Sequence, residues 1–440
     1  MAPWISADAD GPRRGITRFI NCRLVTGDKI VKQDLYVSSV TGKILSSQEL
    51  FFQQCYVADE TVDLQDRLVA PGLIDVQLNG AFGFDFSVVP ENVSDYGKTL
   101  RKVNKDLVKT GVTSYLPTLT SQKPEVYQSA LPFLRPSGGP RDAEDGSESL
   151  GAHCEGPFLN PVKNGIHNTE VLISAEHGLR DIEACYGAEN MQASKQHSRP
   201  GPDQQRAVTM ITAAPEQGKM TQTIPDLVNR GIVYSIGHSD ADYEQASSAV
   251  AKGATMITHL FNAMRPLHHR NPGIFGVLGQ SERQWRPYFG IIADGIHLHP
   301  TAIKIAFDSH PDGFILVTDA MRLVGLPDGI YDWTNGDRIV KKGPHLTLEG
   351  TDKIAGSSIT LIECVSNFLN WSGVGVAEAL KTVTLTPARM LGLHGTKGSL
   401  DSGADADLVV LSEATDAATG HRDLHVDQVW KFGTCVHATK

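Results

Sequence analysis

Cysteine is scarce in this sequence, and the few cysteines are scattered rather than paired. No CxxC pair occurs, and nothing resembles the dense framework of a disulfide-rich secreted domain. This spacing argues against disulfide bonds and is typical of buried thiols in a reducing compartment. The six positions are Cys22, Cys55, Cys154, Cys185, Cys364 and Cys435.

Long apolar runs and basic clusters are also missing. No stretch reaches the roughly 18 apolar residues of a membrane span, and the segment MAPWISADADGPRRG lacks the apolar core of a signal peptide. The chain has 40 Lys and Arg against 50 Asp and Glu, a formal net charge of -10, and no Lys/Arg-rich stripe. We expect a cytosolic, cytoplasmic protein with no membrane or nucleic-acid partner, so a few local cations must meet any anionic substrate.

The pattern that is present alternates strands with helices. Hydrophobic residues make up 40% of the 440 residues, which is enough for a large core. From about residue 69 to residue 319, short β-branched runs alternate with segments of helical periodicity at 96–109, 220–229 and 243–252. About eight such units close a parallel barrel, so we predict an α/β fold with a (β/α)₈ TIM-like catalytic barrel over 69–396. The expected strands cover 68–76, 112–118, 150–156, 207–214, 232–238, 254–260, 288–294 and 313–319.

Other segments depart from this alternation. The stretches 136–149 and 188–205 are rich in Gly, Pro, Ser and charge, and we expect mobile surface insertions there. The chain ends, 1–68 and 397–440, carry short alternating strands with Gly-Asp, Thr-Gly and Ser-Gly turns. We predict that both termini form one small β-sandwich domain, because short strands need partners to bury their apolar faces. Two unrelated terminal extensions are the alternative.

Polar side chains end several of the expected strands. Glu155 ends the third in HCEGPF, His238 the fifth in SIGHSD, His259 the sixth in ITHLFNAM and Asp319 the eighth in LVTDAM. Catalytic groups of such barrels lie at the carboxyl ends of the strands, so these four should share one mouth. Two neutral imidazoles and one carboxylate are a common ligand set for a catalytic Zn²⁺ that keeps a position open for water.

Each of these residues also has a purely structural explanation. A lone histidine at a strand end is more often a hydrogen-bonded core residue than a ligand, Glu155 can cap a helix in the EGP turn, and Asp319 can be an ordinary N-cap. Those explanations do not account for four such residues at the same end of successive strands. We therefore predict one divalent metal ion held by Glu155, His238 and His259. Zn²⁺ is the first expectation, and Fe²⁺, Co²⁺ and Mn²⁺ stay open because affinity and cellular supply both decide.

The same mouth provides groups for catalysis and for substrate. A bound metal ion polarises a carbonyl and activates water, and Asp319 would take that water's proton and pass it to the leaving amine. Loops at this face carry His167 in NGIHN, Asn262 and Ala263 in THLFNAM, Arg270 in HHRNPG and His297 in ADGIHLHP. Arg270 and His297 are candidate phosphate contacts, although a solvated loop cation is the alternative for Arg270. We expect surface or supporting roles for His268, His269 and His299.

Seven motifs together resemble one family. The combination of HxEGPF, THLFNAM and VTDAM is not a generic barrel signature, and the resemblance extends from about Ala70 to the ADADLVVL segment. The motifs resemble those of the N-acetylglucosamine-6-phosphate deacetylases, which belong to the amidohydrolase superfamily. In chain order the motifs are APGLIDVQLNG, HCEGPFLNPVKNGIHN, GHSDA, THLFNAMRPLHHRNPG, IADGIHLHP, VTDAM and AGSSITL.

The resemblance implies an activity and a role for each residue. It implies hydrolysis of N-acetylglucosamine 6-phosphate to glucosamine 6-phosphate and acetate, a step in amino-sugar catabolism. In relatives the phosphate-binding arginine reaches the neighbouring subunit's site, which implies a homodimer. By motif position, the metal ligands are Glu155, His238 and His259, the acid/base is Asp319, the acetyl-carbonyl contact is His167, the sugar contacts are Asn262 and Ala263, and the phosphate contacts are Arg270 and His297.

One motif departs from the wider superfamily. Many members carry HxH at the end of the first strand for a second metal ion, whereas this chain has Gln77-Leu78-Asn79. Amides are poor Zn²⁺ ligands compared with imidazole, so we predict a one-metal site with Gln77 and Asn79 in supporting roles. The missing HxH also argues against the nearest alternative, an amidohydrolase of cyclic amides or aminopurines. A catalytically silent scaffold is the alternative from another class, and the retained His, Glu and Asp residues argue against it.

Overall fold

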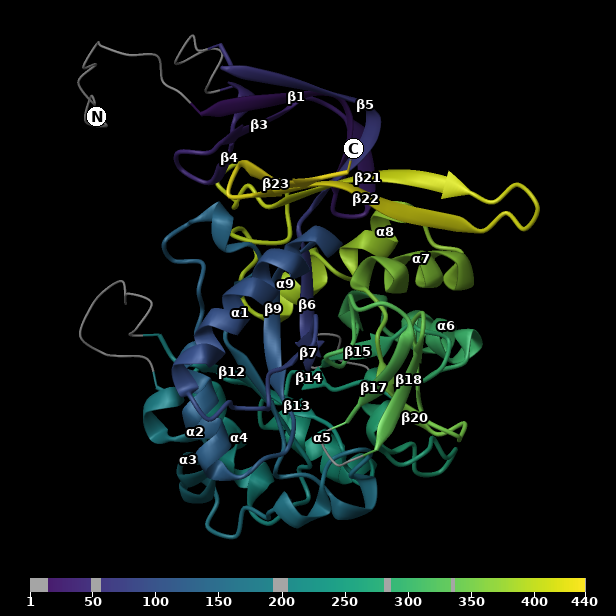
Figure 1. Ribbon diagram of the computed structural model, residues 1–440. Helices are drawn as coiled ribbons and strands as arrows, with labels where there is room; N and C mark the ends of the chain where they lie inside the picture. The colour runs from purple at the N-terminus through teal and green to yellow at the C-terminus, as the bar shows by residue number, and fades with distance from the viewer. Residues whose placement is uncertain (1–14, 49–56, 193–204, 281–285, 334–336, 440) are drawn as a thin grey trace, which may run out of the picture.

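A parallel barrel lies at the centre of the computed structural model, which describes residues 15–48, 57–192, 205–280, 286–333 and 337–439 (Figure 1). Its eight strands pair in chain order, as the sequence predicts. The barrel closes where the Asp319 N–H donates to Gln77 O at 2.9 Å and Leu78 bridges Ala320. The strands are β6 (Leu73–Leu78), β9 (Val112–Leu119), β11 (Ala152–Glu155), β12 (Val208–Ala213), β13 (Val233–Ile236), β14 (Met256–Ile257), β15 (Tyr288–Ile292) and β16 (Phe314–Val317).

The barrel interior changes from apolar to polar along the strands. Alternate side chains of a strand share one face, so residues two apart line the same channel. In β12, Met210 lies in an interior cluster with Ile74 and Val317, which Met390 of α9 (Leu385–Met390) also joins. Two residues further along β12, Thr212 instead hydrogen-bonds other interior polar groups. The barrel therefore has an apolar floor and a polar mouth at the carboxyl ends of its strands.

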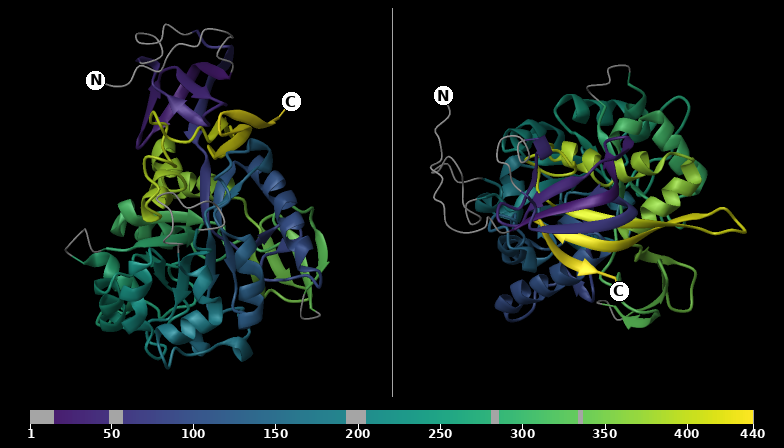
Figure 2. Two further views of the ribbon diagram at one scale, coloured as in Figure 1. Left: turned by 90° about the vertical axis from the view of Figure 1, so that its left-hand side faces the viewer. Right: turned by 90° about the horizontal axis from the view of Figure 1, so that it is seen from above.

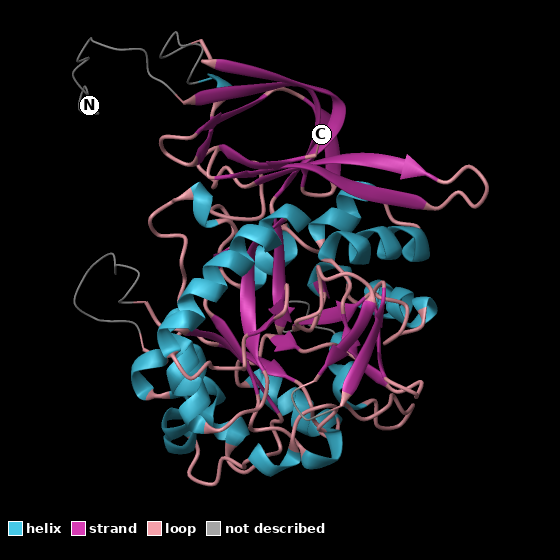
Figure 3. Cartoon of the chain, in the orientation of Figure 1, coloured by secondary structure: helices cyan, strands magenta, loops and turns pink. Residues whose placement is uncertain are grey.

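Amphipathic helices cover the outside of the barrel (Figure 3). In α1 (Val93–Leu107), Leu100 and Val103 are buried, and the Asn92 side chain caps the helix by accepting from the Ser94 N–H. The helices α4 (Met220–Asn229) and α5 (Tyr243–Ala251) also lie where helical periodicity predicts them. No helix within the described ranges is both long and apolar enough to cross a membrane. The other helices of the barrel layer are α2 (Pro124–Ala130), α3 (Leu179–Tyr186), α6 (Pro300–Ser309), α7 (Leu361–Ser372) and α8 (Val376–Lys381).

Strands from both chain ends form one further sheet, which folds over into two layers on top of the barrel (Figures 1 and 2). Phe19 and Trp430 meet between its layers with ring centroids 4.8 Å apart, which confirms a small β-domain built from both termini. One of its strands, β5, crosses position 69 and leads into β6, so the exact domain boundary stays a prediction. The strands are β1 (Ile16–Thr26), β2 (Lys29–Lys32), β3 (Leu35–Ser38), β4 (Lys43–Leu45), β5 (Glu60–Pro71), β21 (Leu408–Thr415), β22 (Arg422–Lys431) and β23 (Thr434–Ala438).

Two segments differ from the sequence expectation. The stretch 136–149 is not wholly a surface insertion, because its end forms buried strand β10 (Glu148–Ser149), which pairs with β9. Of the other polar stretch, 188–205, residues 193–204 lie outside the described residues. After β16 the chain forms an antiparallel sheet that the sequence analysis did not predict. Its short, partly buried strands are β17 (Gly329–Asp332), β18 (Arg338–Lys342), β19 (His345–Leu348) and β20 (Ile354–Ser357).

A buried ionic cluster joins the terminal sheet to the barrel. Lys431 of β22 is fully buried, and its Nζ lies 2.6 Å from Glu148 Oε1 of β10 and 2.8 Å from Asp407 Oδ2. Lys397 pairs with the same two carboxylates and with Asp405. Burial alone would raise the pKa of Asp407, but the charges of Lys397 and Lys431 hold it well below its usual range. Buried charges are tolerated only when paired, so this cluster fixes how the two parts meet.

Replacing Lys431 with Met should destabilise the protein strongly. The substitution leaves Glu148 and Asp407 short of a buried cation, a loss that costs about 3–5 kcal/mol in comparable cases. The free energy of unfolding in urea measures it. Lys32→Met is the control, because the Lys32–Asp66 pair has a similar 2.7 Å separation but is exposed, and such pairs contribute about 0–1 kcal/mol. Equal losses in the two variants would contradict the prediction.

Candidate metal centre and substrate site

Three predicted ligands meet at the mouth of the barrel. Glu155 is the last residue of β11, and His238 and His259 each follow a strand, β13 and β14, by two residues. His238 Nε2 and His259 Nε2 each lie 3.2 Å from Glu155 Oε1 and 3.0 Å from each other. The three side chains are only 2–4% exposed. The structure therefore brings two imidazole nitrogens and one carboxylate oxygen around one point.

This donor set fits a divalent metal ion. Ligands about 2.0–2.2 Å from one tetrahedral Zn²⁺ lie roughly 3.3–3.6 Å apart, close to the separations seen here. His238 Nδ1 lies 2.8 Å from the Lys163 carbonyl oxygen. In that hydrogen bond Nδ1 donates, so the neutral ring presents an unprotonated Nε2 to the centre, the usual support of a metal-binding histidine. Burial raises the pKa of Glu155, but the two adjacent histidines outweigh it and hold the pKa well below its usual range.

His167 is a second histidine neighbour of this point. Glu155, His167 and His238 also offer ligand atoms within 4.8 Å of one another. However, His167 Nδ1 accepts from the Ser121 N–H at 3.1 Å and lies 2.8 Å from Ser121 Oγ. Burial lowers the pKa of His167 to about 3, so the ring is neutral and its proton resides on Nε2. His167 therefore offers a hydrogen-bond donor at Nε2, and His259 stays the predicted third ligand.

Asp319 is tied to the ligand set by two amides. Its Oδ1 accepts from Asn79 Nδ2 at 2.7 Å and from Gln77 Nε2 at 3.1 Å. Gln77 Nε2 also lies 3.1 Å from Glu155 Oε1, so one amide contacts both carboxylates. Burial and, next, the charge of Glu155 raise the pKa of Asp319 to about 6. Gln77 and Asn79 therefore orient the predicted base.

The backbone turns sharply at the functional residues. His238, His259 and Asp319 have φ angles of 47°, 27° and 46°, and Ala263 has 48°. Residues with a Cβ seldom adopt positive φ, and such conformations persist where the surrounding structure enforces them, often at active sites. Here each turn ends a strand or shapes the following loop, so that the side chain points into the mouth.

The predicted substrate residues lie in the loops around this point. Asn262 Nδ2 donates to His259 O at 3.3 Å, and Ala263 O accepts from the Ser239 N–H at 3.2 Å. His297 Nδ1 lies 2.6 Å from Asp294 Oδ2, which fixes its ring. Arg270 is exposed on the surface. The structure therefore attaches the Asn262–Ala263 segment directly to a ligand and leaves Arg270 turned to the solvent.

Several supporting residues were not predicted from the sequence. His153 is buried below Glu155, with ring nitrogens 3.2 Å from Thr118 Oγ1 and 2.7 Å from Thr212 Oγ1. Its signal was the strand alternation, which places His153 and Glu155 on one face of AHCE. Asp294 is the partner of His297 and stands three residues before it in ADGIH. Of the histidines left in supporting roles, His299 caps α6 by accepting from the Thr301 N–H at 3.1 Å.

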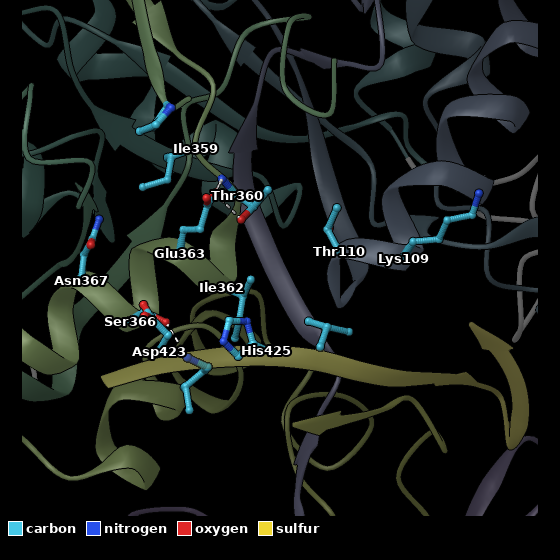
Figure 4. A pocket seen from close by; sticks show the side chains of 13 residues that line it. Lys109, Thr110, Ile359, Thr360, Ile362, Glu363, Ser366, Asn367, Asp423 and His425 are labelled. Atoms are coloured by element: carbon cyan, nitrogen blue, oxygen red, sulfur yellow. Dashed lines mark hydrogen bonds between the residues drawn. The ribbon is translucent and has the colours of Figure 1, made fainter. Parts of the chain in front are cut away.

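A separate cavity of about 500 Å³ lies at the junction of β22, α7 and the turn after α1 (Figure 4). None of the predicted site residues lines it. Its polar groups are used structurally: Glu363 accepts from the Thr360 N–H at the start of α7, and Ser366 Oγ accepts from the Leu424 N–H. The cavity is therefore part of the seam between the terminal sheet and the barrel.

Comparisons with known proteins show the family of this chain. The amidohydrolase family model matches residues 68–436. The N-acetylglucosamine-6-phosphate deacetylase of Mus musculus is 43% identical over 428 residues, which are 96% of this chain and 95% of the relative. The structure of the Pasteurella multocida enzyme of that name has a TM-score of 0.76 and 28% identity, with 96% of this chain and all of that chain covered.

A further solved structure holds a ligand. A variant of N-acetyl-D-glucosamine-6-phosphate deacetylase from Mycobacterium smegmatis, in complex with N-acetyl-D-glucosamine-6-phosphate, has a TM-score of 0.72 and 26% identity over 96% of this chain and 99% of that chain. The match of the family model over most of the chain, together with relatives above 40% identity, shows the family. This chain belongs to the amidohydrolase family and, within it, to the N-acetylglucosamine-6-phosphate deacetylases.

Proposed function

We propose that this protein hydrolyses N-acetylglucosamine 6-phosphate to glucosamine 6-phosphate and acetate. The observation that carries the proposal is the convergence of Glu155, His238 and His259 within 3.2 Å of one another, with Asp319 joined to them through Gln77. The names of the relatives above supply the substrate, and the site supplies groups suited to amide hydrolysis.

The metal ligands in this proposal are Glu155, His238 and His259. A divalent cation bound there polarises the acetyl carbonyl and makes water nucleophilic near neutral pH. We propose Zn²⁺, because two imidazoles and one carboxylate are a frequent catalytic zinc set. Fe²⁺, Co²⁺ and Mn²⁺ accept the same donors, so metal analysis of the purified protein decides among them.

Asp319 and His167 carry the proton chemistry and the carbonyl contact. Held by Asn79 and Gln77, the Asp319 carboxylate takes the proton of the attacking water and returns it to the leaving nitrogen, which departs poorly unless protonated. The His167 Nε2–H donates a hydrogen bond to the acetyl oxygen, where negative charge develops. The Ser121 N–H keeps the imidazole in the tautomer that makes this donation.

The remaining residues bind the sugar phosphate. We propose that Asn262 and Ala263 contact the sugar and that His297 and Arg270 contact the phosphate. Asp294 fixes the His297 ring through the 2.6 Å contact, so that Nε2 is the free nitrogen. An arginine fork matches phosphate oxygens well, and charge-assisted hydrogen bonds are the strong ones.

We propose a homodimer in which Arg270 reaches the neighbouring subunit's site. Val162, Ile166 and Leu267 are 81%, 57% and 54% exposed on two loops that flank the metal centre. Large apolar side chains that are this exposed favour a protein interface. Arg270 is exposed in the same loop as Leu267 and is therefore available to a second subunit. The cytoplasmic location stays a prediction; free thiols at Cys22, Cys154, Cys185, Cys364 and Cys435 support a reducing compartment.

Acetate release should depend on both the phosphate and the metal ion. We expect kcat/KM about 10- to 100-fold lower for N-acetylglucosamine than for its 6-phosphate, since charge-assisted hydrogen bonds contribute about 1.5–3 kcal/mol. A chelator should abolish release from both sugars, and added Zn²⁺ should restore it. Equal rates on the two sugars would contradict the proposed phosphate contacts. Activity that survives full metal removal would contradict the proposed need for a metal ion.

Asp319→Asn should bind metal and substrate but turn over slowly. The amide cannot accept a proton, so kcat should fall about 10²- to 10⁴-fold with little change in metal content. Asp308→Asn is the control, because Asp308 lies on the exposed side of α6, paired with Lys304. Steady-state kinetics together with metal analysis make the comparison. Near-parent turnover in Asp319→Asn would remove Asp319 from the mechanism.

Asn79→Ala should shift the acid limb of the pH profile. Asp319 acts in its ionised form, so activity falls as the pH drops through its pKa. The Asn79 hydrogen bond favours the ionised form, and its loss raises the Asp319 pKa and moves the acid limb of kcat/KM to higher pH. The alkaline limb is the internal control. An unchanged or lowered acid limb would show that Asn79 does not tune Asp319.

A further inference from the structure

Asp240 bridges two loops beside the metal centre. It follows His238 by two residues, and its Oδ2 lies 2.7 Å from Arg265 Nη2 while its Oδ1 lies 3.4 Å from Lys163 Nζ. Lys163 belongs to the loop that ends at His167, which we name the acetyl loop (residues 160–167). Arg265 belongs to the loop that carries Asn262, Ala263 and Arg270, which we name the sugar loop (residues 262–270).

The acetyl loop is attached to the ligand His238. The Lys163 carbonyl oxygen lies 2.8 Å from His238 Nδ1, and the Asn160 N–H donates to His238 O at 2.9 Å. Gly165 packs on the imidazole so closely that an added Cβ would lie 3.2 Å from Cε1. The position of Lys163 therefore sets the orientation of a metal-binding ring, and its side chain is held by Asp240.

The sugar loop is attached to the same turn from the other side. The Ser239 N–H donates to Ala263 O at 3.2 Å, and Ser239 and Met264 form a parallel bridge. The Asp240–Arg265 pair follows immediately after this bridge. The backbone of residues 238–240 therefore contacts both loops. The Asp240 carboxylate contacts both loops as well.

Glu216 fixes Asp240 in place. Glu216 Oε1 accepts from the Asp240 N–H at 2.8 Å and from Asn160 Nδ2 at 2.9 Å, and its Oε2 accepts from Ser239 Oγ at 2.7 Å. Partly exposed ion pairs contribute little to stability. A carboxylate anchored at its backbone and shared between two loops instead has its main effect on where those loops lie.

We propose that Asp240 is a positioning residue that holds the acetyl loop and the sugar loop in register around His238. The part of this proposal that concerns substrate affinity rests on the proposed function. Through Lys163, Asp240 orients the His238 ring toward the metal ion. Through Arg265, it sets the Asn262–Ala263 segment and, further along the loop, Arg270. One side chain therefore couples metal affinity to substrate affinity.

Single variants separate the effect on metal affinity from the effect on substrate affinity. Zn²⁺ affinity is measured by competition with a chromophoric chelator, and kcat and KM for N-acetylglucosamine 6-phosphate are measured at saturating Zn²⁺. Asp240→Asn should lower Zn²⁺ affinity about tenfold, within the range for loss of a group that supports a ligand. It should also raise KM about tenfold, less than the roughly 100-fold cost of a full 1 Å misplacement. Lys163→Met should reproduce the first effect and Arg265→Gln the second.

Coupling between variants distinguishes positioning from general loosening. Asp240→Asn/Arg265→Gln should have the KM of Asp240→Asn alone, because both substitutions break one contact. Glu183→Gln is the matched control: it removes a 2.6 Å ion pair with Arg230 on the outer helices and should leave both readouts at parent values. Thermal unfolding of every variant shows that all are folded.

Parent values of Zn²⁺ affinity and KM in Asp240→Asn would overturn the proposal, as would effects of Asp240→Asn and Arg265→Gln that multiply. If the parent protein itself releases no acetate, the proposed function fails. The Zn²⁺ competition then still decides whether Asp240 acts on His238 through Lys163, because that readout needs no turnover.

Discussion

The negative charge of Glu155, buried at the mouth of the barrel, constrains everything around it. A buried carboxylate must be compensated by donors or cations. His238, His259 and Gln77 provide that compensation, and together with Glu155 they leave a point suited to a divalent ion. The same charge, added to the effect of burial, raises the pKa of the neighbouring Asp319. Two carboxylates that share one amide donor thus acquire different acidities, which suits the roles proposed for Glu155 and Asp319.

The barrel provides this arrangement through the alternation of its strands. In AHCE, Cys154 faces the outer core while His153 and Glu155 face the interior. His153 and the threonines beneath the metal centre hydrogen-bond one another, so polar groups below Glu155 have partners without water. The strained turns at His238, His259 and Asp319 then direct each side chain back over the strand ends. The rigid strands therefore place these residues at one mouth, and the loops that Asp240 joins complete the positioning of His238.

The sequence could predict the parts of the site that follow from periodicity. Glu155, His238, His259 and Asp319 were placed at one mouth because each ends a strand of a parallel barrel, and the structure brings them together there. Their chemical roles remain proposals. Contacts between segments far apart in the chain could not be predicted from periodicity. Gln77 of the first barrel strand contacts Asp319 after the last one, and Glu148 contacts Lys431 of the terminal sheet. The sheet β17–β20 escaped prediction because its strands have only four or five residues each, too few to show a clear alternation.

The pairing of β5 with β21 has a consequence for biosynthesis. The first strands of the chain reach the ribosome exit long before β21 and β22 exist, so the edge of β5 has no partner while the entire barrel is being made. An unpaired edge strand invites association with other chains. The pairing of β21 with β5 therefore closes this edge, and the buried pairing of Lys431 with Glu148 can form only after β22 has been synthesised.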